Sequence, residues 1–484
     1  MQAEGPGATS PESAGGAGGP EELGEAPEHG VPPAFARGIP PTGGTSLPDA
    51  PAPRASRREF ALLLVAAAAL QVLAWAVIII VVRRFYPQYW DATIPDVLHY
   101  AEVVWAVRHG GWPYTQVPFE YPPLTLIPLL IPPDIAQFTR YALEFKIEMV
   151  AVFALNGVLT TWAAMKLWSS QQRALAAAVA LAATIPATGL IGLNRFDATL
   201  GLVIILGVLC LLYRRWALAG LMVGLGLSLK LMPIVLLPLV LVLARRWRAV
   251  WWALLAAALG AVVPFLPFFI QGGSSFFTST VGGQTARGLQ IETVAASPFL
   301  LRNILQPGSV RVVVPNGGSL SIVARGAGTV NSAAPLLVFA LVLIVYLVIW
   351  QARRGLRATP EAVPVAVLAL MVATMCGNKV LSPQHLIWVL PVVALALVAT
   401  RWAWRVPAIL MFVAMVLTQV EFPGMYWDTI ALKSTAIVVI ALRNLTLIAV
   451  LVTSLVALWR LPRAAPDAAT AAGAPPVQAA TVDS

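Results

Sequence analysis

Apolar stretches long enough to cross a lipid bilayer recur along this chain, and they limit its fold more than any other feature. Each holds roughly 17 to 25 residues, the length that a membrane-spanning helix needs. Hydrophobic residues make up 58% of the 484 residues and charged residues 11%, and the mean hydropathy is +0.79. Because helices satisfy their own backbone hydrogen bonds in lipid, these stretches predict an all-α polytopic membrane protein.

We place twelve membrane helices on these stretches, with both chain termini in the cytoplasm. The basic clusters between stretches, such as 245–248 and 353–357, mark cytoplasmic loops. Arg83 and Arg84 are the exception, because they follow the first stretch on the outer side. Two long segments, 83–144 and 271–333, then face outward. The predicted spans are 61–82, 145–167, 174–192, 198–213, 217–229, 231–244, 249–270, 334–350, 361–376, 385–400, 406–420 and 435–458.

The fifth and sixth spans are too short for ordinary crossings. Only about 29 residues separate Arg215 from Arg245, too few for two full helices at about 1.5 Å per residue. We therefore predict a hairpin of two short helices, with Lys230 at its tip inside the bilayer thickness. Irregular backbone at that depth is tolerated where it lines a cavity in the protein.

One membrane domain, 56–463, is predicted between two cytoplasmic tails. Residues 1–55 are rich in Gly, Pro, Ala and Glu, and residues 464–484 in Ala and Pro, so neither can bury a core and both are expected to be disordered. We expect no signal peptide, because no basic n-region opens the chain. Cys210 and Cys376 indicate no disulfide framework. The net charge of +10 is spread over the loops between spans, which argues against nucleic acid as a partner.

Most acidic residues of the predicted membrane domain map to the outer face. Carboxylates gathered on one face of a membrane protein indicate a functional site, although solvated outer loops also contain acids. Asp96 allows both interpretations. It could close a capping box with Thr93 at the start of a short helix, or it could act as a base at the membrane surface.

Polar segments also follow each outward helix end, and seven short motifs stand in them. They are D-x-x-x-Y at 96–100, G-x-P-Y at 111–114, E-Y-P-P-L at 120–124, N-x-F-D at 194–197, L-K-L-x-P at 229–233, R-G-L-Q-I-E at 287–292 and K-V-L-S-P-Q-H at 379–385. In their order along the chain these motifs resemble glycosyltransferase family 87, and the resemblance covers roughly residues 60–460. It implies a GT-C-like bundle similar to the polyprenol-phosphate-mannose-dependent alpha-1,2-mannosyltransferases of actinobacteria.

The residues also agree with a donor that already lies in the membrane. The sequence holds no D-x-D metal pair and no strand–glycine loop–helix unit for a nucleotide, so we expect neither a metal nor a cofactor. The resemblance implies a polyprenyl-phosphate sugar as donor, a hydroxyl of a cell-envelope glycolipid or glycan as acceptor, and inversion at the sugar. In this scheme Asp96 is the general base that accepts the hydroxyl proton.

Other site residues are assigned around that chemistry. His385 is the candidate catalytic partner, because an imidazole bonded to the carboxylate would orient it, although His385 could equally satisfy a helix start. Arg443 lies inside the last span and could meet the lipid phosphate or pair with a buried acid. The candidate substrate-binding residues are Tyr100, Glu120, Tyr121, Asn194, Asp197, Lys230, Arg287, Gln290, Glu292, Lys379 and Gln384. Five of them could equally be loop caps or surface groups: Asn194, Asp197, Gln290, Glu292 and Gln384.

Two other functions fit a twelve-span protein. A secondary transporter would place its polar sites near the midplane and often shows repeat symmetry, whereas here the charges lie at outer helix ends and no repeat is visible. A lipid flippase or scaffold would not need Asp96. Within the enzyme interpretation, the sequence leaves open whether the sugar is mannose or a pentose such as arabinose. The expected location is the plasma membrane, with the active site on the extracytoplasmic face.

Overall fold

The computed structural model describes residues 56–90, 94–133, 137–273, 275, 278–282, 287–314 and 320–461. The chain divides into Met1–Pro53 and Arg54–Ser484, and only the second unit contains described residues. The predicted tails, 1–55 and 464–484, lie outside the described residues. So does Thr93, the expected capping partner of Asp96.

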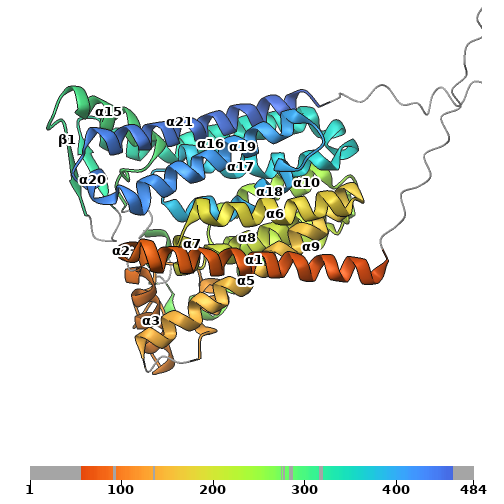
Figure 1. Ribbon diagram of the computed structural model, residues 1–484, viewed down its shortest axis with the longest axis horizontal. Helices are drawn as coiled ribbons and strands as arrows, with labels where there is room; N and C mark the ends of the chain where they lie inside the picture. Colours follow the sequence, from red (N-terminus) through yellow and green to blue (C-terminus); the bar gives the residue numbers. More distant parts are fainter. Residues whose placement is uncertain are drawn as a thin grey trace, which may run out of the picture. The chain divides into compact units, whose positions relative to one another are not determined.

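Helices make up most of the described chain and overlap each of the predicted apolar stretches, with ends that differ from the predicted bounds by up to eight residues. The predicted hairpin 217–229 and 231–244, for example, is seen as α9 (Trp216–Leu229) followed by η2 (Met232–Leu236) and α10 (Leu237–Leu243), with Lys230 between them. The remaining bundle helices are α1 (Arg57–Phe85), α5 (Phe138–Trp168), α6 (Gln171–Thr188), α8 (Asp197–Leu212), α11 (Trp247–Val262), α16 (Ala327–Ala358), α17 (Val363–Gly377), α18 (Leu390–Leu397), α19 (Trp402–Gln419) and α21 (Ser434–Trp459). They run alongside one another in Figure 1.

By length and composition, six helices within the described residues could each cross a membrane, or seven if the bent pair of α11 and α12 (Leu266–Gly272) is one span. The all-α polytopic membrane protein expected from the sequence is therefore confirmed, whereas the count of twelve crossings is not. Several other apolar helices of the bundle, such as α8 and α9, are shorter than 18 residues.

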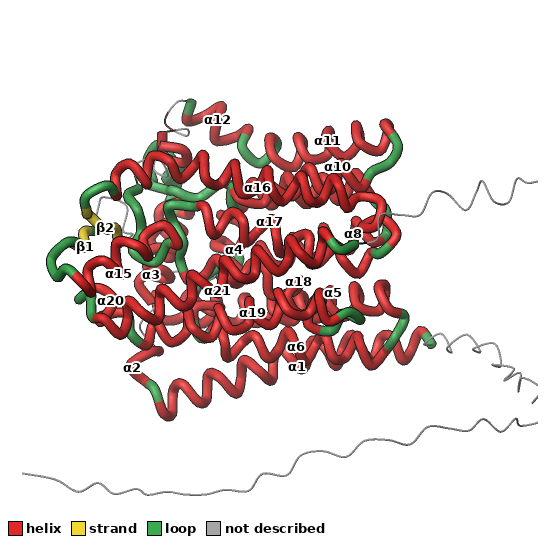
Figure 2. Tube along the Cα trace, turned by 90° about the horizontal axis from the view of Figure 1, so that it is seen from above, coloured by secondary structure: helices red, strands yellow, loops and turns green. Residues whose placement is uncertain are grey.

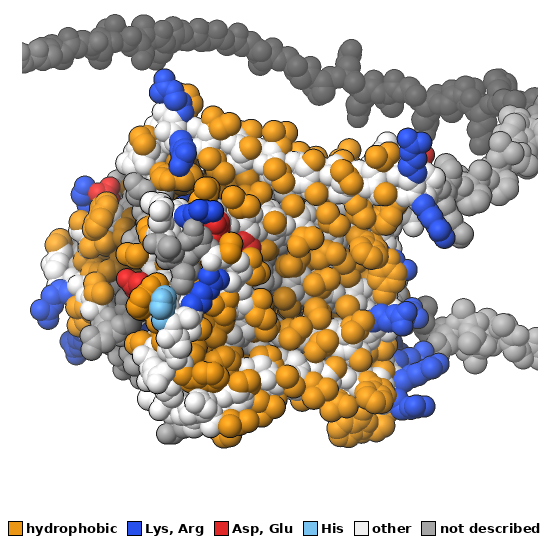
Figure 3. All heavy atoms as spheres, turned by 90° about the horizontal axis from the view of Figure 1, so that it is seen from below, with side chains coloured by type: hydrophobic (Ala, Val, Ile, Leu, Met, Phe, Trp, Pro, Cys, Tyr) orange, Lys and Arg blue, Asp and Glu red, His pale blue; other side chains and the backbone are white. Residues whose placement is uncertain are grey.

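Helix α17 is completely buried in the bundle. Every residue of α17 is buried, and the helix packs against α16, α18 and α21, as Figure 2 shows from above. A helix that is apolar on all sides belongs in a core. In contrast, only 17% of the most apolar window of α1 and of α16 is buried. These helices present their hydrophobic side chains outward, and hydrophobic side chains cover much of the face seen in Figure 3.

Close packing of α9 against α11 fixes the position of Lys230. Gly220 and Gly224 form a G-x-x-x-G pair, the small-residue pattern that lets membrane helices approach closely. A Cβ atom added at Gly220 would lie 2.1 Å from the Ala253 carbonyl oxygen, and one at Gly224 would lie 2.2 Å from the Ala257 carbonyl oxygen. Because α9 ends at Leu229, this contact sets where the next residue, Lys230, leaves the helix.

The two predicted outward segments gather at one end of the bundle (Figure 1). The first contains α2 (Pro87–Trp90), α3 (Ile94–Arg108), η1 (Pro123–Thr125) and α4 (Leu126–Leu130). The second contains η3 (Thr278–Gly282), η4 (Val294–Ala296), α15 (Ser297–Leu305), β1 (Val310–Val313) and β2 (Ser321–Ala324). The strands pair antiparallel with Val310 opposite Ala324, a small sheet that the sequence analysis did not predict. Helix α1 begins and helix α21 ends at the opposite end of the bundle (Figure 1).

Candidate functional site

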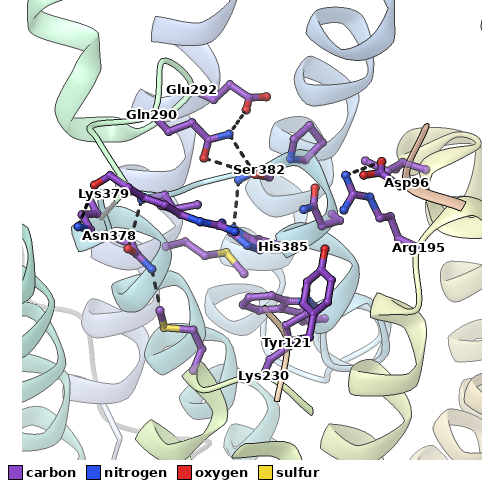
Figure 4. A pocket seen from close by; sticks show the side chains of 18 of the residues that line it. Asp96, Tyr121, Arg195, Lys230, Gln290, Glu292, Asn378, Lys379, Ser382 and His385 are labelled. Atoms are coloured by element: carbon purple, nitrogen blue, oxygen red, sulfur yellow. Dashed lines mark hydrogen bonds and ion pairs between the residues drawn. The ribbon is translucent and has the colours of Figure 1, made fainter. Parts of the chain in front are cut away.

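A cavity of about 420 Å³ opens at the end of the bundle that the outward segments cover. Its lining comes from α3, from the loop before η1, from the breaks between α7 (Ile191–Asn194) and α8 and between α9 and η2, and from the loops 287–292 and 378–385. Figure 4 shows side chains from these distant segments facing one another. The polar side chains stand where helices are interrupted, because non-helical backbone within a membrane protein is tolerated where it lines a cavity.

Asp96 faces the cavity from the first turn of α3 and forms an ion pair with Arg195. The Arg195 Nη2 atom lies 2.5 Å from Asp96 Oδ2, and the two side chains are 17% and 31% exposed. Burial raises the pKa of the Asp96 carboxyl above its usual range, and the guanidinium of Arg195 opposes that rise. The aspartate is therefore held in place as a carboxylate with raised proton affinity, in contact with the cavity.

Lys230 lies at the base of the cavity inside a cage of aromatic rings. Its Nζ atom is 4.5 Å from the ring centre of Phe196, 5.2 Å from that of Tyr121 and 5.9 Å from that of Trp388. The same atom lies 3.3 Å from Asp197 Oδ1, a side chain with no exposed surface. Trp388 Nε1 donates to that oxygen at 2.6 Å. The ammonium is thus oriented by a buried carboxylate while it remains part of the cavity wall.

Two further cations line the opposite side. Arg287 Nη2 donates to Glu120 Oε2 at 2.6 Å, and Lys379 Nζ donates to the Arg287 carbonyl at 2.9 Å. Burial, and after it the charge of Arg287, lowers the pKa of Lys379. Four cationic side chains therefore surround the cavity, and each is positioned by a protein oxygen: Arg195, Lys230, Arg287 and Lys379.

A glutamine network joins the loop 287–292 to the loop 378–385. Gln290 Nε2 donates to Ser382 Oγ at 3.0 Å and to Glu292 Oε2 at 2.6 Å, and Gln290 Oε1 accepts from the Leu381 amide at 2.9 Å. The Ser382 amide in turn donates to His385 Nδ1 at 3.1 Å. Because Nδ1 accepts, a neutral His385 ring carries its proton on Nε2 and acts there as a donor.

His385 therefore does satisfy a helix start, one of the two roles that the sequence left open. The partner of Asp96 is Arg195, in the place where His385 was expected, and in Figure 4 the imidazole lies below Ser382 of the glutamine network. His385 packs on Trp388, with the ring centres 4.4 Å apart. His385 also lines the cavity, where it can reach a substrate. Its part in catalysis stays a prediction.

Glu292 and Arg443 form a buried layer behind the network. Arg443 Nη2 donates to the Glu292 carbonyl at 2.7 Å, and Asn444 Nδ2 donates to the Thr293 carbonyl at 3.0 Å. Burial, and after it the facing carboxylate of Glu421, raises the pKa of Glu292 well above its usual range. Arg443 does not line the cavity, and its printed hydrogen bond goes to a backbone carbonyl, so the two roles left open for it, a donor phosphate or a buried acid, both stay predictions.

Comparison with known families identifies the chain. The family model of glycosyltransferase family 87 matches residues 119–383, which is more than half of the 484 residues. The chain belongs to glycosyltransferase family 87. It is therefore a membrane enzyme that transfers glycosyl groups from a sugar donor to an acceptor. No curated protein is significantly similar to it. The matched range includes Arg195, Lys230 and Arg287, whereas Asp96 and His385 lie outside it.

The predicted site residues of this family 87 protein divide into two groups. Most line the cavity: Asp96, Glu120, Tyr121, Lys230, Arg287, Gln290, Glu292, Lys379, Gln384 and His385. Tyr100, Asn194 and Asp197 are almost completely buried and are not part of the lining. Tyr100 packs against the rings of Tyr121 and Phe196, so it supports the wall. Contact between these three residues and a substrate stays a prediction.

Sequence reasoning missed several residues of the glycosyltransferase cavity. Arg195 was part of a quoted motif, and its position two residues before Asp197 in an interrupted helix was the available signal. Asn378, Ser382, Trp388 and Tyr426 also line the cavity. No signal in the sequence marked Tyr426, which follows an apolar helix. Among the described residues, no group of three His, Cys, Asp or Glu side chains is arranged to hold a metal ion.

Proposed function

We propose that this enzyme transfers a hexosyl group, mannose by resemblance, from a polyprenyl-phosphate sugar to a hydroxyl of a cell-envelope glycolipid or glycan, with inversion. One observation carries the proposal. A single cavity brings the carboxylate of Asp96 together with four positioned cations, Arg195, Lys230, Arg287 and Lys379. A base and a phosphate-binding surface are the two elements that such a transfer requires.

In the proposed reaction the acceptor oxygen attacks the anomeric carbon while Asp96 accepts the hydroxyl proton. The bond between the anomeric carbon and the phosphate oxygen breaks, and its electron pair leaves with the polyprenyl phosphate. A raised pKa suits this role, because a base of ordinary aspartate pKa has little proton affinity at neutral pH. Arg195 holds the carboxylate and keeps it ionised between turnovers.

The cations stabilise the negative charge that develops on the departing phosphate. Lys230 is the best placed, because the aromatic cage and Asp197 fix its ammonium without covering it. Arg287 and Lys379 contribute from the other wall. Gln290 and Gln384 line the cavity and supply amides that suit sugar hydroxyls. Glu120 accepts a hydrogen bond from Arg287 and also lines the cavity, so it can position that arginine and bind a sugar hydroxyl as well.

The membrane arrangement follows from the same proposal. The cavity end lies on the extracytoplasmic face of the plasma membrane and the arginine-rich opposite end faces the cytoplasm, with both termini there. The shorter helices α8 and α18 and the hairpin of α9 and α10 complete the GT-C-like set of about twelve helices beside the longer ones. The start of α1 and the end of α21 lie at the same end of the bundle, which fits an even number of crossings.

A donor assay tests the proposal. The purified protein in lipid vesicles is supplied with radiolabelled polyprenyl-phosphate mannose, and a parallel reaction receives radiolabelled GDP-mannose. We expect transfer to extracted envelope glycolipid from the polyprenyl donor alone. Transfer from the nucleotide sugar alone would refute the donor class, and transport of free sugar without transfer would refute the reaction. Polyprenyl-phosphate arabinose, as a third donor, decides between the two sugars.

A further inference from the structure

The end of the bundle opposite the catalytic cavity carries a second, larger concavity of about 1250 Å³. It is framed by the C-terminal end of α8, the N-terminal ends of α9 and α11, and the last turn of α16. The 16 residues of α8 run from Asp197 beside the catalytic cavity to Leu212 in this concavity, about 24 Å at 1.5 Å per residue. The two sites are therefore on opposite sides of the bundle.

Arginine dominates the charge of this concavity. Six of its lining residues are exposed arginines, and no Asp or Glu is among the described residues that line it: Arg214, Arg215, Arg245, Arg246, Arg248 and Arg357. Arg357 donates to the Val242 carbonyl, which fixes its guanidinium at the rim. Lys and Arg side chains also cluster at this end of the molecule in Figure 3.

The rest of the lining is apolar and lies on membrane helices. Trp216 and Trp252 contribute aromatic rings, and Leu218 and Trp252 remain 48% and 57% exposed. Tryptophan is enriched at the level of lipid headgroups, where one part of the ring is in contact with hydrocarbon and the other with water. A ligand that fits must carry an anionic group for the arginines and an apolar part for these side chains.

We propose that this concavity binds the phosphate headgroup of an anionic membrane phospholipid from the leaflet opposite the catalytic cavity. Guanidinium groups bind phosphate through paired N–H donors, which makes arginine the preferred residue for such headgroups. A basic surface beside membrane helices attracts anionic lipid in proportion to its charge. A soluble phosphate would satisfy the arginines but leave Trp252 and Leu218 without a partner. The proposal does not depend on the donor or acceptor of the transferase.

Native mass spectrometry of the full-length protein in detergent tests the assignment. The protein is exposed to equal amounts of palmitoyl-oleoyl phosphatidylglycerol and phosphatidylcholine, and the bound lipids are counted. We expect a preference for phosphatidylglycerol of at least about fivefold, which decreases as salt rises. Equal retention of the two lipids would overturn the proposal. So would displacement of the bound lipid by inorganic phosphate at equal concentration, because that result assigns the site to a soluble anion.

A pair of matched variants separates the concavity from general surface charge. The test variant replaces Arg215, Arg245 and Arg248 with glutamine. The control variant replaces three exposed arginines outside the concavity at the same end, Arg57, Arg58 and Arg460. We expect the test variant to lose the lipid preference and the control to keep it. Equal loss in both would show that diffuse charge, and not this site, retains the lipid.

A second measurement uses the wild-type protein, so that it does not depend on the folding of a variant. A phosphatidylglycerol with a photoreactive acyl chain is bound, irradiated and mapped by peptide sequencing. Cross-links are expected in the peptides that contain Trp216 to Leu218 and Ala249 to Trp252. Cross-links spread evenly over the lipid-facing helices α1 and α16 would contradict a defined site.

Discussion

Replacement of Arg195 by glutamine should shift the pH dependence of transfer. The guanidinium of Arg195 lies 2.5 Å from the Asp96 carboxylate and opposes the rise that burial causes in the pKa of that carboxyl. Its removal takes away the largest opposing charge and leaves the weaker effects of His99 and Lys230, so the pKa of Asp96 rises further. A general base works only when it is deprotonated, so the acid limb of the profile should move to higher pH.

The size of the shift can be worked from the geometry. Two unit charges about 4 Å apart interact by about 4 kcal/mol at an effective dielectric constant of 20, which corresponds to roughly three pKa units. The side chains of Arg195 and Asp96 are 17% and 31% exposed, so water screens part of this interaction. We therefore expect the acid limb to move up by about 1 to 2 pH units.

The assay is kcat/KM for sugar transfer from polyprenyl-phosphate mannose as a function of pH, with Arg195→Lys as the control. The lysine keeps the charge but loses the planar donor group, so its acid limb should move by less than about half a pH unit. A uniform loss of rate in Arg195→Gln, with the acid limb unmoved, would refute the reasoning. That result would mean that Arg195 acts on the leaving phosphate and does not tune the base.

Two further predictions concern stability, measured by thermal denaturation in detergent. Lys230→Met leaves the fully buried Asp197 carboxylate without its cation, so we expect the variant to lose about 3–5 kcal/mol of unfolding free energy. The double variant Lys230→Met with Asp197→Leu should regain more than half of that loss, and equal stability of the single and double variants would contradict the pairing. Gly220→Ala places a Cβ 2.1 Å from the Ala253 carbonyl oxygen and should lower the unfolding free energy by about 1–3 kcal/mol. In Gly207→Ala the new Cβ meets its nearest neighbour at 3.5 Å, so this control should change stability little. Similar midpoints for the two glycine variants would show that α9 and α11 do not pack as described.

The helices could be predicted from the sequence because their signal is local. A stretch of apolar residues bounded by charges marks where a membrane helix begins and ends, and the predicted span 217–229 agrees with the observed helix Trp216–Leu229. The unusual spacing between Arg215 and Arg245 also predicted the broken hairpin around Lys230. The strand pair β1–β2 was missed, although the sequence between its strands contains Asn316-Gly317, a typical hairpin turn signal.

The partners within the site could not be predicted, because they depend on tertiary packing. The sequence placed Asp96 and Arg195 in polar segments that face outward, but it could not show that their side chains meet across about a hundred residues. It assigned Asp197 to the substrate but could not show that this buried carboxylate pairs with Lys230 and accepts from Trp388. A motif shows that a residue is placed at a helix end, and packing decides toward which side it points.

The central claim is that Asp96 is the general base, and Asp96→Asn tests it most directly. The assay is the initial rate of transfer at saturating donor, with Glu120→Gln as the matched control, because that change alters the other carboxylate–arginine pair of the cavity. We expect Asp96→Asn to lower turnover by roughly 100- to 10,000-fold with donor binding little changed, and Glu120→Gln to lower it by less than about tenfold. If folded Asp96→Asn protein retains more than about a third of wild-type turnover, Asp96 does not accept the proton and the account is wrong.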